Sequence, residues 1–225
     1  MTKKWMMGMV TVGMLAAGLL DAAAYTQLKF GGEGVIPGDD SWDIGYGASA
    51  QVIFWTDSGL GLALSAGAQI WDVNDDVTGY VEDVGGGFVA KYREGFEGDA
   101  VMLPLGASGL YRIALGETTS LILEGGLRYV IVNSNVKFVE AFEVDDATGN
   151  ALVEAMSYDI DLDNGVVGLV GGDFEVALSE SFNLFAGAGY QFDVLKGDIS
   201  VVGIDSDVEN ELKAFYARAG ISLDI

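Results

Sequence analysis

Apolar and polar residues alternate with a period of two along eight separate stretches of this chain. In residues 182–194, the even positions from Phe182 to Val194 are apolar, whereas the odd positions include Asn183 and Gln191. Because successive side chains of a β-strand point to opposite faces, this pattern predicts strands with one apolar face and one small or polar face. The eight stretches are residues 27–34, 42–55, 60–70, 101–115, 121–131, 166–178, 182–194 and 213–225.

The connections between these stretches alternate between short and long. Residues 56–59, 116–120 and 179–181 have the length and composition of tight turns, whereas residues 34–41, 72–100, 134–164 and 195–212 form longer links. In an up-and-down barrel with an even number of strands, the short turns and both chain ends then lie on one rim. The sequence therefore predicts an all-β fold, an eight-stranded antiparallel up-and-down barrel.

The composition of the two faces predicts which one points outward. Each predicted strand except the first carries a largely unbroken apolar face and is long enough to cross a membrane when tilted. A membrane barrel exposes such a face to lipid and keeps polar groups inside. Aromatic residues near the strand ends then form interfacial girdles: Trp42, Phe54, Phe182, Phe192 and Phe215. The alternative is a soluble secreted lipid-binding barrel with its apolar face inside.

The N-terminus has the pattern of a cleaved signal peptide. Lys3 and Lys4 precede an apolar stretch from Trp5 to Leu20, and small residues follow at 22–24. This order of a positive, an apolar and a small-residue segment predicts export. We therefore expect residues 1–24 to be a signal peptide and residues 25–225 to form the barrel domain.

The composition excludes several classes of function. The chain has no His and no Cys, which removes disulfides, thiolate metal sites and the commonest general base. With 11 Lys and Arg against 34 Asp and Glu, its net charge of −23 argues against a nucleic-acid partner. We expect no cofactor.

Local phrases on the predicted strands resemble a known family. These are residues 103–105 before 109–112, residues 125–129, and residues 186–192, which read LPL, GLYR, GGLRY and AGAGYQF. They resemble small Gram-negative outer-membrane β-barrels of the OmpA/OmpX type, also described as porin-like, over essentially all of the mature chain. The resemblance implies a location in the bacterial outer membrane, with lipopolysaccharide and outer-membrane lipid as neighbours and a structural or surface-interaction role.

The same resemblance bears on assembly and catalysis. Members of the family end in a strand that the barrel-assembly machinery recognises, and the matching positions here are Phe215, Ile221, Leu223 and Ile225, with Ile in place of the usual terminal aromatic residue. The enzymatic outer-membrane barrels of this size use a His in catalysis. Since this chain has none, the sequence predicts that it is not an enzyme.

Charged residues on the polar faces predict a network inside the barrel. They are Arg112, Glu124, Arg128, Asp173, Glu175 and Arg218. Because unpaired charges in a confined lumen are costly, we expect ion pairs that plug the lumen. The alternative is a narrow channel for small solutes or ions that these charges line.

Two acidic segments are candidates for divalent cations. Asp72, Asn74 and Asp76 resemble the opening of a calcium loop, although Val77 replaces the expected glycine. Asp159, Asp161 and Asp163 form a second row. The alternative interpretation is that both segments are solvated acidic loops, and the sequence assigns no metal to either.

The link at residues 134–164 contains two further strand-like runs, at 136–144 and 152–162, around a turn at 145–150. Its even positions, including Tyr158 and Ile160, keep the phase of Val166 and Val170. We therefore expect a hairpin that extends two barrel strands beyond the membrane and offers an adhesive or partner-binding edge. A passive loop is the alternative. For residues 72–100, the sequence leaves a short helix or another hairpin open.

Overall fold

A computed structural model describes residues 23–38, 42–74, 78–85, 88–145, 151–201 and 204–225. This part of the chain contains the strands β1 (Tyr25–Pro37), β2 (Gly45–Trp55), β3 (Leu60–Asn74), β4 (Thr78–Gly85), β5 (Phe88–Ala114), β6 (Thr119–Asp145), β7 (Ala151–Leu162), β8 (Gly165–Ala177), β9 (Phe182–Leu195), β10 (Gly197–Val201), β11 (Ile204–Asn210) and β12 (Ala214–Asp224). No helix in the described ranges is long and apolar enough to cross a membrane.

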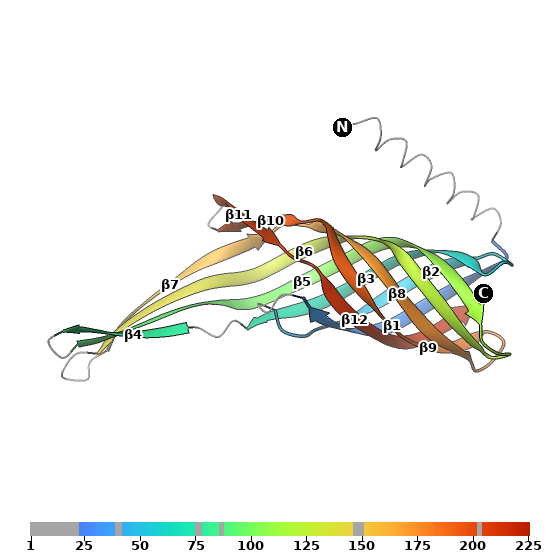
Figure 1. The fold of residues 1–225 in the computed structure, drawn as a ribbon, viewed down its shortest axis with the longest axis horizontal. Coiled ribbons are helices and arrows are strands. Elements are labelled where there is room, and N and C mark those ends of the chain that lie inside the picture. Colours follow the sequence, from blue (N-terminus) through green and yellow to red (C-terminus); the bar gives the residue numbers. More distant parts are fainter. Residues whose placement is uncertain (1–22, 39–41, 75–77, 86–87, 146–150, 202–203) are drawn as a thin grey trace, which may run out of the picture.

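Eight of these strands close into a barrel (Figure 1). Around the barrel the order is β1, β2, β3, β5, β6, β8, β9 and β12, and β12 pairs with β1 to close the ring. All neighbours are antiparallel, so each barrel strand is hydrogen-bonded on both sides. The prediction of an eight-stranded antiparallel up-and-down barrel is confirmed.

The register fixes how far the strands are staggered. Starting at Glu33 on β1, the partner residues lead through β12, β9 and β8 to Ile122 on β6. In the other direction they lead through β2, β3 and β5 to Val132 on the same strand. The ring therefore closes with a stagger of ten residues, from Ile122 to Val132, which requires strands tilted to the barrel axis.

Side chains divide between the two faces as the alternation predicts. On β6, the side chain of Leu127 is on the outside with a relative exposure of 54%, while its neighbour Arg128 is inside at 2%. The outer surface of the barrel is apolar on every side, with residues such as Phe30, Leu64, Leu105, Leu123, Val170, Leu184 and Ile221. An apolar outside around a polar inside is the distribution of membrane barrels and the reverse of soluble ones.

Tight turns and both chain ends share one rim, which we call the turn end. Turns at 56–59, 115–118 and 178–181 close by backbone hydrogen bonds across each hairpin. Thr26 and Ile225 exchange backbone hydrogen bonds, and Asp224 donates to the carbonyl of Ser181. The predicted placement of the short turns is therefore confirmed.

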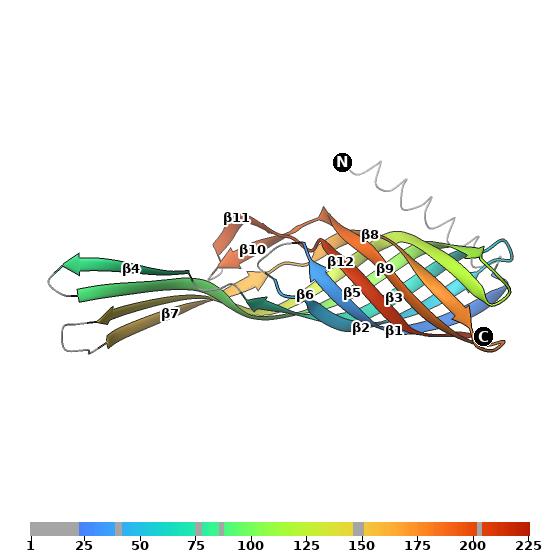
Figure 2. The ribbon, with the colours of Figure 1, turned by 60° about the horizontal axis from the view of Figure 1, so that its bottom comes forward.

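The opposite rim, the sheet end, continues into a long protruding sheet (Figures 1 and 2). β5 and β6 pair without interruption from Ala114 and Ser120 to Val89 and Asp145. We define the protruding sheet as β4, residues 88–99 of β5, residues 133–145 of β6, and β7. β4 pairs with β5 and β7 pairs with β6. Residues 72–100 thus include a hairpin of β4 and β5, and the predicted hairpin in 134–164 is confirmed as β6 and β7.

The predicted phase between this hairpin and the next barrel strand is wrong. Ile160 is buried on the inner face, whereas Val170 on β8 points outward. β6 advances six residues, from Val130 to Val136, while the facing chain covers only the five from Ile160 to Gly165. Because the side-chain period is two, this one-residue difference reverses the faces.

The placement of Trp42 in an outer aromatic girdle is also wrong. Its ring makes an edge-to-face contact with Trp71, with centroids 5.7 Å apart, and it packs against the buried apolar cluster at the sheet end. Trp42 lies before β2 begins and forms an isolated bridge to Val73. The strand alternation therefore does not govern its direction.

Candidate functional site

The barrel lumen is the principal cluster of charged groups in the described structure, and its side chains lie in three successive layers. The layer nearest the turn end is apolar and consists of Ile53, Trp55, Ala63, Leu110 and Ile122, with Tyr25 packed against it. These residues come from β2, β3, β5 and β6, and four of them are less than 2% exposed. This layer lies against the wall formed by β2, β3, β5 and β6 near the turn end.

The middle layer is built around Arg218 of β12. Its guanidinium bonds both carboxylate oxygens of Asp173 at 2.8 Å and also contacts Glu124. Lys29 donates to Asp173 at 2.5 Å. Because these four residues stand on β12, β8, β6 and β1, the ion pairs connect four different walls. All four are at most 5% exposed, so solvent screens these attractions little.

A second ion pair lies beside the apolar layer of the turn end. Arg112 bonds Glu175 at 2.9 Å and contacts the Tyr25 hydroxyl, and its guanidinium carbon lies 4.3 Å from the Trp55 ring centroid. The Trp55 indole donates to Gln27 at 3.2 Å. Arg112 also reaches a pocket of about 510 Å³ that opens at this rim. These bonds give the Trp55 indole and the Tyr25 hydroxyl a partner, whereas Nε of Arg112 has none in the described protein.

The third layer closes the sheet end and is again apolar. It contains Val35, Trp71, Ala100, Met102, Val130, Val167, Leu212, Ala214 and Tyr216. Leu212 belongs to the segment 211–213, between β11 and β12. Its N–H donates to Asp193 at 2.8 Å and its carbonyl accepts from Gln191 at 2.6 Å. The two backbone bonds hold Leu212 over the mouth of the barrel.

Two opposite charges below this layer have no ion pair among the described residues. They are Glu33 on β1 and Arg128 on β6. The ladder through Glu33 meets β6 at Ile122 and Val132, so Arg128 stands at the same height on the opposite wall. One Glu33 oxygen accepts from Gln69 at 2.9 Å. The other oxygen, and Nε and Nη1 of Arg128, have no hydrogen-bond partner in the described protein.

Tyr216 lies beside two guanidinium groups, those of Arg128 and Arg218. The guanidinium carbons of Arg128 and Arg218 lie 5.5 Å and 5.7 Å from the centroid of its ring. The Tyr216 hydroxyl reaches toward Gly171 and Gly189, where an added Cβ would come within 2.4 Å of it. Glycine at these two positions therefore makes room for the tyrosine. The cation–π contact accounts for how Arg128 is held without a carboxylate.

The structure brings five of the six expected lumen charges into ion pairs: Arg112 with Glu175, and Arg218 with Glu124 and Asp173. Arg128 faces inward but stays apart from them. The sequence missed Lys29, Glu33 and Gln27, all inside on β1. Their alternation with apolar or small residues in 27–34 was the available signal, but that stretch is the weakest of the eight. Whether the charges act as a plug stays a prediction.

The candidate cation ligands whose side chains the structure describes are exposed. Asp72 and Asn74 belong to β3, with Asp72 exposed, and Asp76 lies outside the described residues. Asp159 and Asp161 are exposed on β7, and Asp163 is exposed just after it. No group of three Asp or Glu side chains in the described ranges is arranged to hold a metal ion. Cation binding by these segments stays a prediction.

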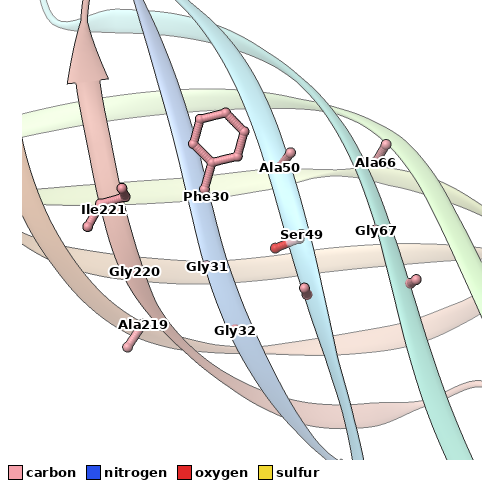
Figure 3. Close-up of a pocket in the computed structure, with 12 residues that line it drawn as sticks. Phe30, Gly31, Gly32, Ser49, Ala50, Ala66, Gly67, Ala219, Gly220 and Ile221 are labelled. Atoms are coloured by element: carbon pink, nitrogen blue, oxygen red, sulfur yellow. The ribbon is translucent and has the colours of Figure 1, made fainter.

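The remaining candidate residues are on the outer surface of the barrel. Phe215 and Ile221 on β12 are 62% and 37% exposed, Leu223 is partly exposed, and Ile225, just after β12, is 73% exposed. Beside Phe30 and Ile221, small residues of β1, β2, β3 and β12 leave a groove of about 700 Å³ (Figure 3). The groove has glycine, alanine and one serine but no charged side chain. It offers space without a catalytic group.

Known structures share this fold. The outer membrane protein OprG from Pseudomonas aeruginosa is 13% identical, with a TM-score of 0.57 and 91% of this chain and 97% of that chain covered. A major outer membrane protein from Thermus thermophilus is 17% identical, with a TM-score of 0.48 and 90% and 100% covered. Ail of Yersinia pestis, solved with the heparin analogue sucrose octasulfate, is 13% identical, with a TM-score of 0.38 and 89% and 97% covered. The sequence matches no protein-family model and no curated protein. The similarity to OprG confirms the expected resemblance to small outer-membrane barrels at the level of the fold.

Replacing Arg218 tests the middle layer. Arg218→Met leaves Glu124 and Asp173 buried with less compensation, and breaking a buried ion pair costs about 3–5 kcal/mol. We expect a loss of that order in the free energy of unfolding, measured by urea titration in lipid vesicles. The double variant Glu124→Gln/Arg218→Met removes one stranded charge and should recover part of the loss. Equal stability of Arg218→Met and the wild type would contradict this assignment.

Low pH tests the segment over the sheet end. Hydrogen bonds from Lys213 and then Lys196 lower the pKa of Glu211 below its usual value of 4.5. A carboxyl whose pKa is lowered by folding stabilises the folded state above its unfolded pKa, and this contribution is lost as the pH falls through the folded pKa. We therefore expect the Leu212 amide to lose protection from hydrogen exchange as the pH falls. After correction for intrinsic rates, this loss should exceed that of amides at the barrel centre.

The variant Glu211→Gln should reproduce this loosening at neutral pH and reduce its pH dependence. The amide of Ala188, at the centre of β9, serves as the internal reference. If Glu211→Gln leaves the protection of Leu212 unchanged at neutral pH, the ion pairs of Glu211 do not hold the segment.

Proposed function

We propose that this protein is an integral protein of the bacterial outer membrane, with a sealed lumen and a structural or surface-interaction role carried by the protruding sheet. The apolar outer surface of the closed barrel supports a membrane location. Outer-membrane barrels place their short turns in the periplasm and their longer connections outside the cell. The turn end then faces the periplasm, and the protruding sheet lies outside the cell. Outer-membrane lipid and lipopolysaccharide then surround the barrel, and the barrel-assembly machinery would recognise β12.

The observation that supports the sealed lumen is the presence of buried side chains at both of its ends and in its middle. Trp55 and its neighbours occupy the turn end, the ion pairs of Arg218 span the middle, and Trp71 with Leu212 occupies the sheet end. Eight strands leave an interior that side chains can fill completely. The two apolar layers present few groups that could replace the hydration of a passing ion.

The narrow channel remains the second candidate, because Glu33 and Arg128 face one another without an ion pair. Charged groups of both signs could line a hydrated section of the lumen between the middle layer and the third layer at the sheet end. The soluble lipid-binding barrel does not fit. It needs an apolar cavity inside, where this barrel has Lys29, Glu124 and Arg218.

A non-catalytic role is part of the same proposal. It is supported by the absence of His and Cys from the chain, which removes the usual general base and the strongest nucleophile. The large extension of β5 and β6 beyond the barrel offers surface for contact with other molecules. Contact at the cell surface accounts for that extension better than chemistry inside the lumen.

Single-channel recording in planar lipid bilayers tests the sealed lumen. The mature protein should insert without reproducible unitary current steps, because each layer blocks the path of a hydrated ion. The heat-dependent shift on detergent gels verifies that the protein added to the bilayer is folded. Reproducible steps whose size changes in Arg128→Gln would contradict the sealed lumen and support the channel.

A further inference from the structure

One edge of β7 has no neighbouring strand over most of its length. β7 pairs with β6 from Ala151 to Ile160, and on its other side β10 reaches only Ile160, Asp161 and Leu162. In the described part of the chain, residues 151–159 therefore have one unpaired edge. Figure 1 shows this strand at the border of the protruding sheet, beyond the barrel. An unpaired edge is a template for a further strand.

The direction of the free backbone groups follows from Ser134 on β6. Its hydroxyl donates to the carbonyl of Ile160 and accepts from the N–H of Leu162, so these two residues of β7 point their backbone groups at β6. Backbone groups alternate in direction along an antiparallel strand. Ser157 and Asp159 therefore direct their N–H and C=O toward the open edge, and both residues are exposed.

The inner face of the sheet carries an aromatic ladder that ends at this edge. Phe96, Phe138 and Tyr158 stand side by side on β5, β6 and β7, with ring centroids 5.3 Å and 6.4 Å apart. Met156 lies next to Tyr158 and is 49% exposed. A strand added at the edge would place a side chain beside Tyr158, where an apolar or aromatic residue would continue the ladder.

The outer face of the same edge is acidic. Asp159 and Asp161 project from it and are exposed. Behind Asp159 in the register stands Lys137 on β6, and then Glu97 on β5; Asp99 lies two residues further along β5. One cation among four carboxylates leaves a negative surface. Since opposite charges on neighbouring strands attract, this face selects Lys or Arg on an added strand.

We propose that the free edge of β7 binds an extended segment of a partner protein in which cationic residues alternate with apolar or aromatic ones. The backbone of the segment pairs with Ser157 and Asp159, its apolar side chains lie beside Tyr158 and Met156, and a cation lies beside Asp159. Asp161, whose own edge is paired with β10, adds negative charge next to this cation. This docking rests on the proposed surface-interaction role and names its partner. A second copy of this chain is disfavoured, because each copy carries a net charge of −23.

The test uses the mature protein in nanodiscs of uncharged lipid and a labelled nine-residue peptide that alternates lysine with valine or tyrosine. Fluorescence anisotropy at physiological ionic strength should show saturable binding that empty nanodiscs lack. A peptide of the same composition with its lysines in one block, and one with glutamate for lysine, should bind at least about tenfold more weakly, because each mismatches one face.

Ser157→Pro removes an outward N–H without removing a bond to β6 and should weaken binding at least about tenfold, whereas Ser157→Ala should not. Asp159→Asn/Asp161→Asn should weaken binding roughly 3- to 10-fold. The matched control Asp57→Asn/Glu180→Gln removes two charges at the turn end and should have no effect. A peptide N-methylated at alternate residues gives a second test of the backbone pairing that needs no change in the protein.

Equal binding of the block and alternating peptides would overturn the proposal, and so would equal losses in the control and the edge variants. Full binding of the N-methylated peptides, in both methylation phases, would also overturn it. A protein that stays silent in bilayers and binds no peptide loses the docking proposal alone. Ion conduction would overturn the proposal of a sealed lumen, whether or not the peptide binds.

Discussion

The closed ring of backbone hydrogen bonds is the constraint on which the rest of this structure depends. Each barrel strand is hydrogen-bonded to a neighbour on both sides, as a barrel surrounded by lipid requires. Closure also fixes the direction of every side chain, because a strand of the ring has only an inside and an outside. The ten-residue stagger then sets which residues share a height in the lumen. Arg128 and Glu33 face one another for this reason, although 95 positions separate them in the sequence.

The lumen and the protruding sheet differ in how their polar groups are satisfied. Inside, charged side chains are buried in a narrow space and are stabilised mainly by one another, as in the contacts of Arg218 with Asp173 and Glu124. Outside the barrel, β5 and β6 continue as a sheet that lacks a closing partner. β4 and β7 extend that sheet by one strand on each side, and the edge of β7 therefore stays available. The barrel supplies a rigid base, and the sheet carries the groups that a partner could reach.

The sequence alone predicts the barrel because its signal is local: a period of two, repeated between short turns. It predicts most of the lumen charges for the same reason, since Glu124 and Arg128 stand at alternate positions of a clear strand. The sequence analysis missed Lys29 because the strand of Lys29 alternates weakly. It misplaced Trp42 because this residue precedes its strand. The reversed phase after Leu162 could not be foreseen, because it depends on how many residues of β6 lie opposite the break. Pairing partners such as Arg218 and Asp173 depend on the stagger, which no single strand encodes.

The most direct test of this account asks which face of β6 meets lipid. The natural chain has no cysteine, so single nitroxide labels can be placed at Leu123, Leu127 and Tyr129 on one face and at Ile122 and Val130 on the other. In lipid vesicles, the first three labels should be relaxed strongly by oxygen dissolved in the bilayer and weakly by an aqueous nickel complex. Labels at Ile122 and Val130 should be shielded from both reagents. Strong oxygen relaxation at Ile122 and Val130 with shielding at Leu127, or exposure of Leu127 to the nickel complex, would contradict a lipid-facing apolar surface.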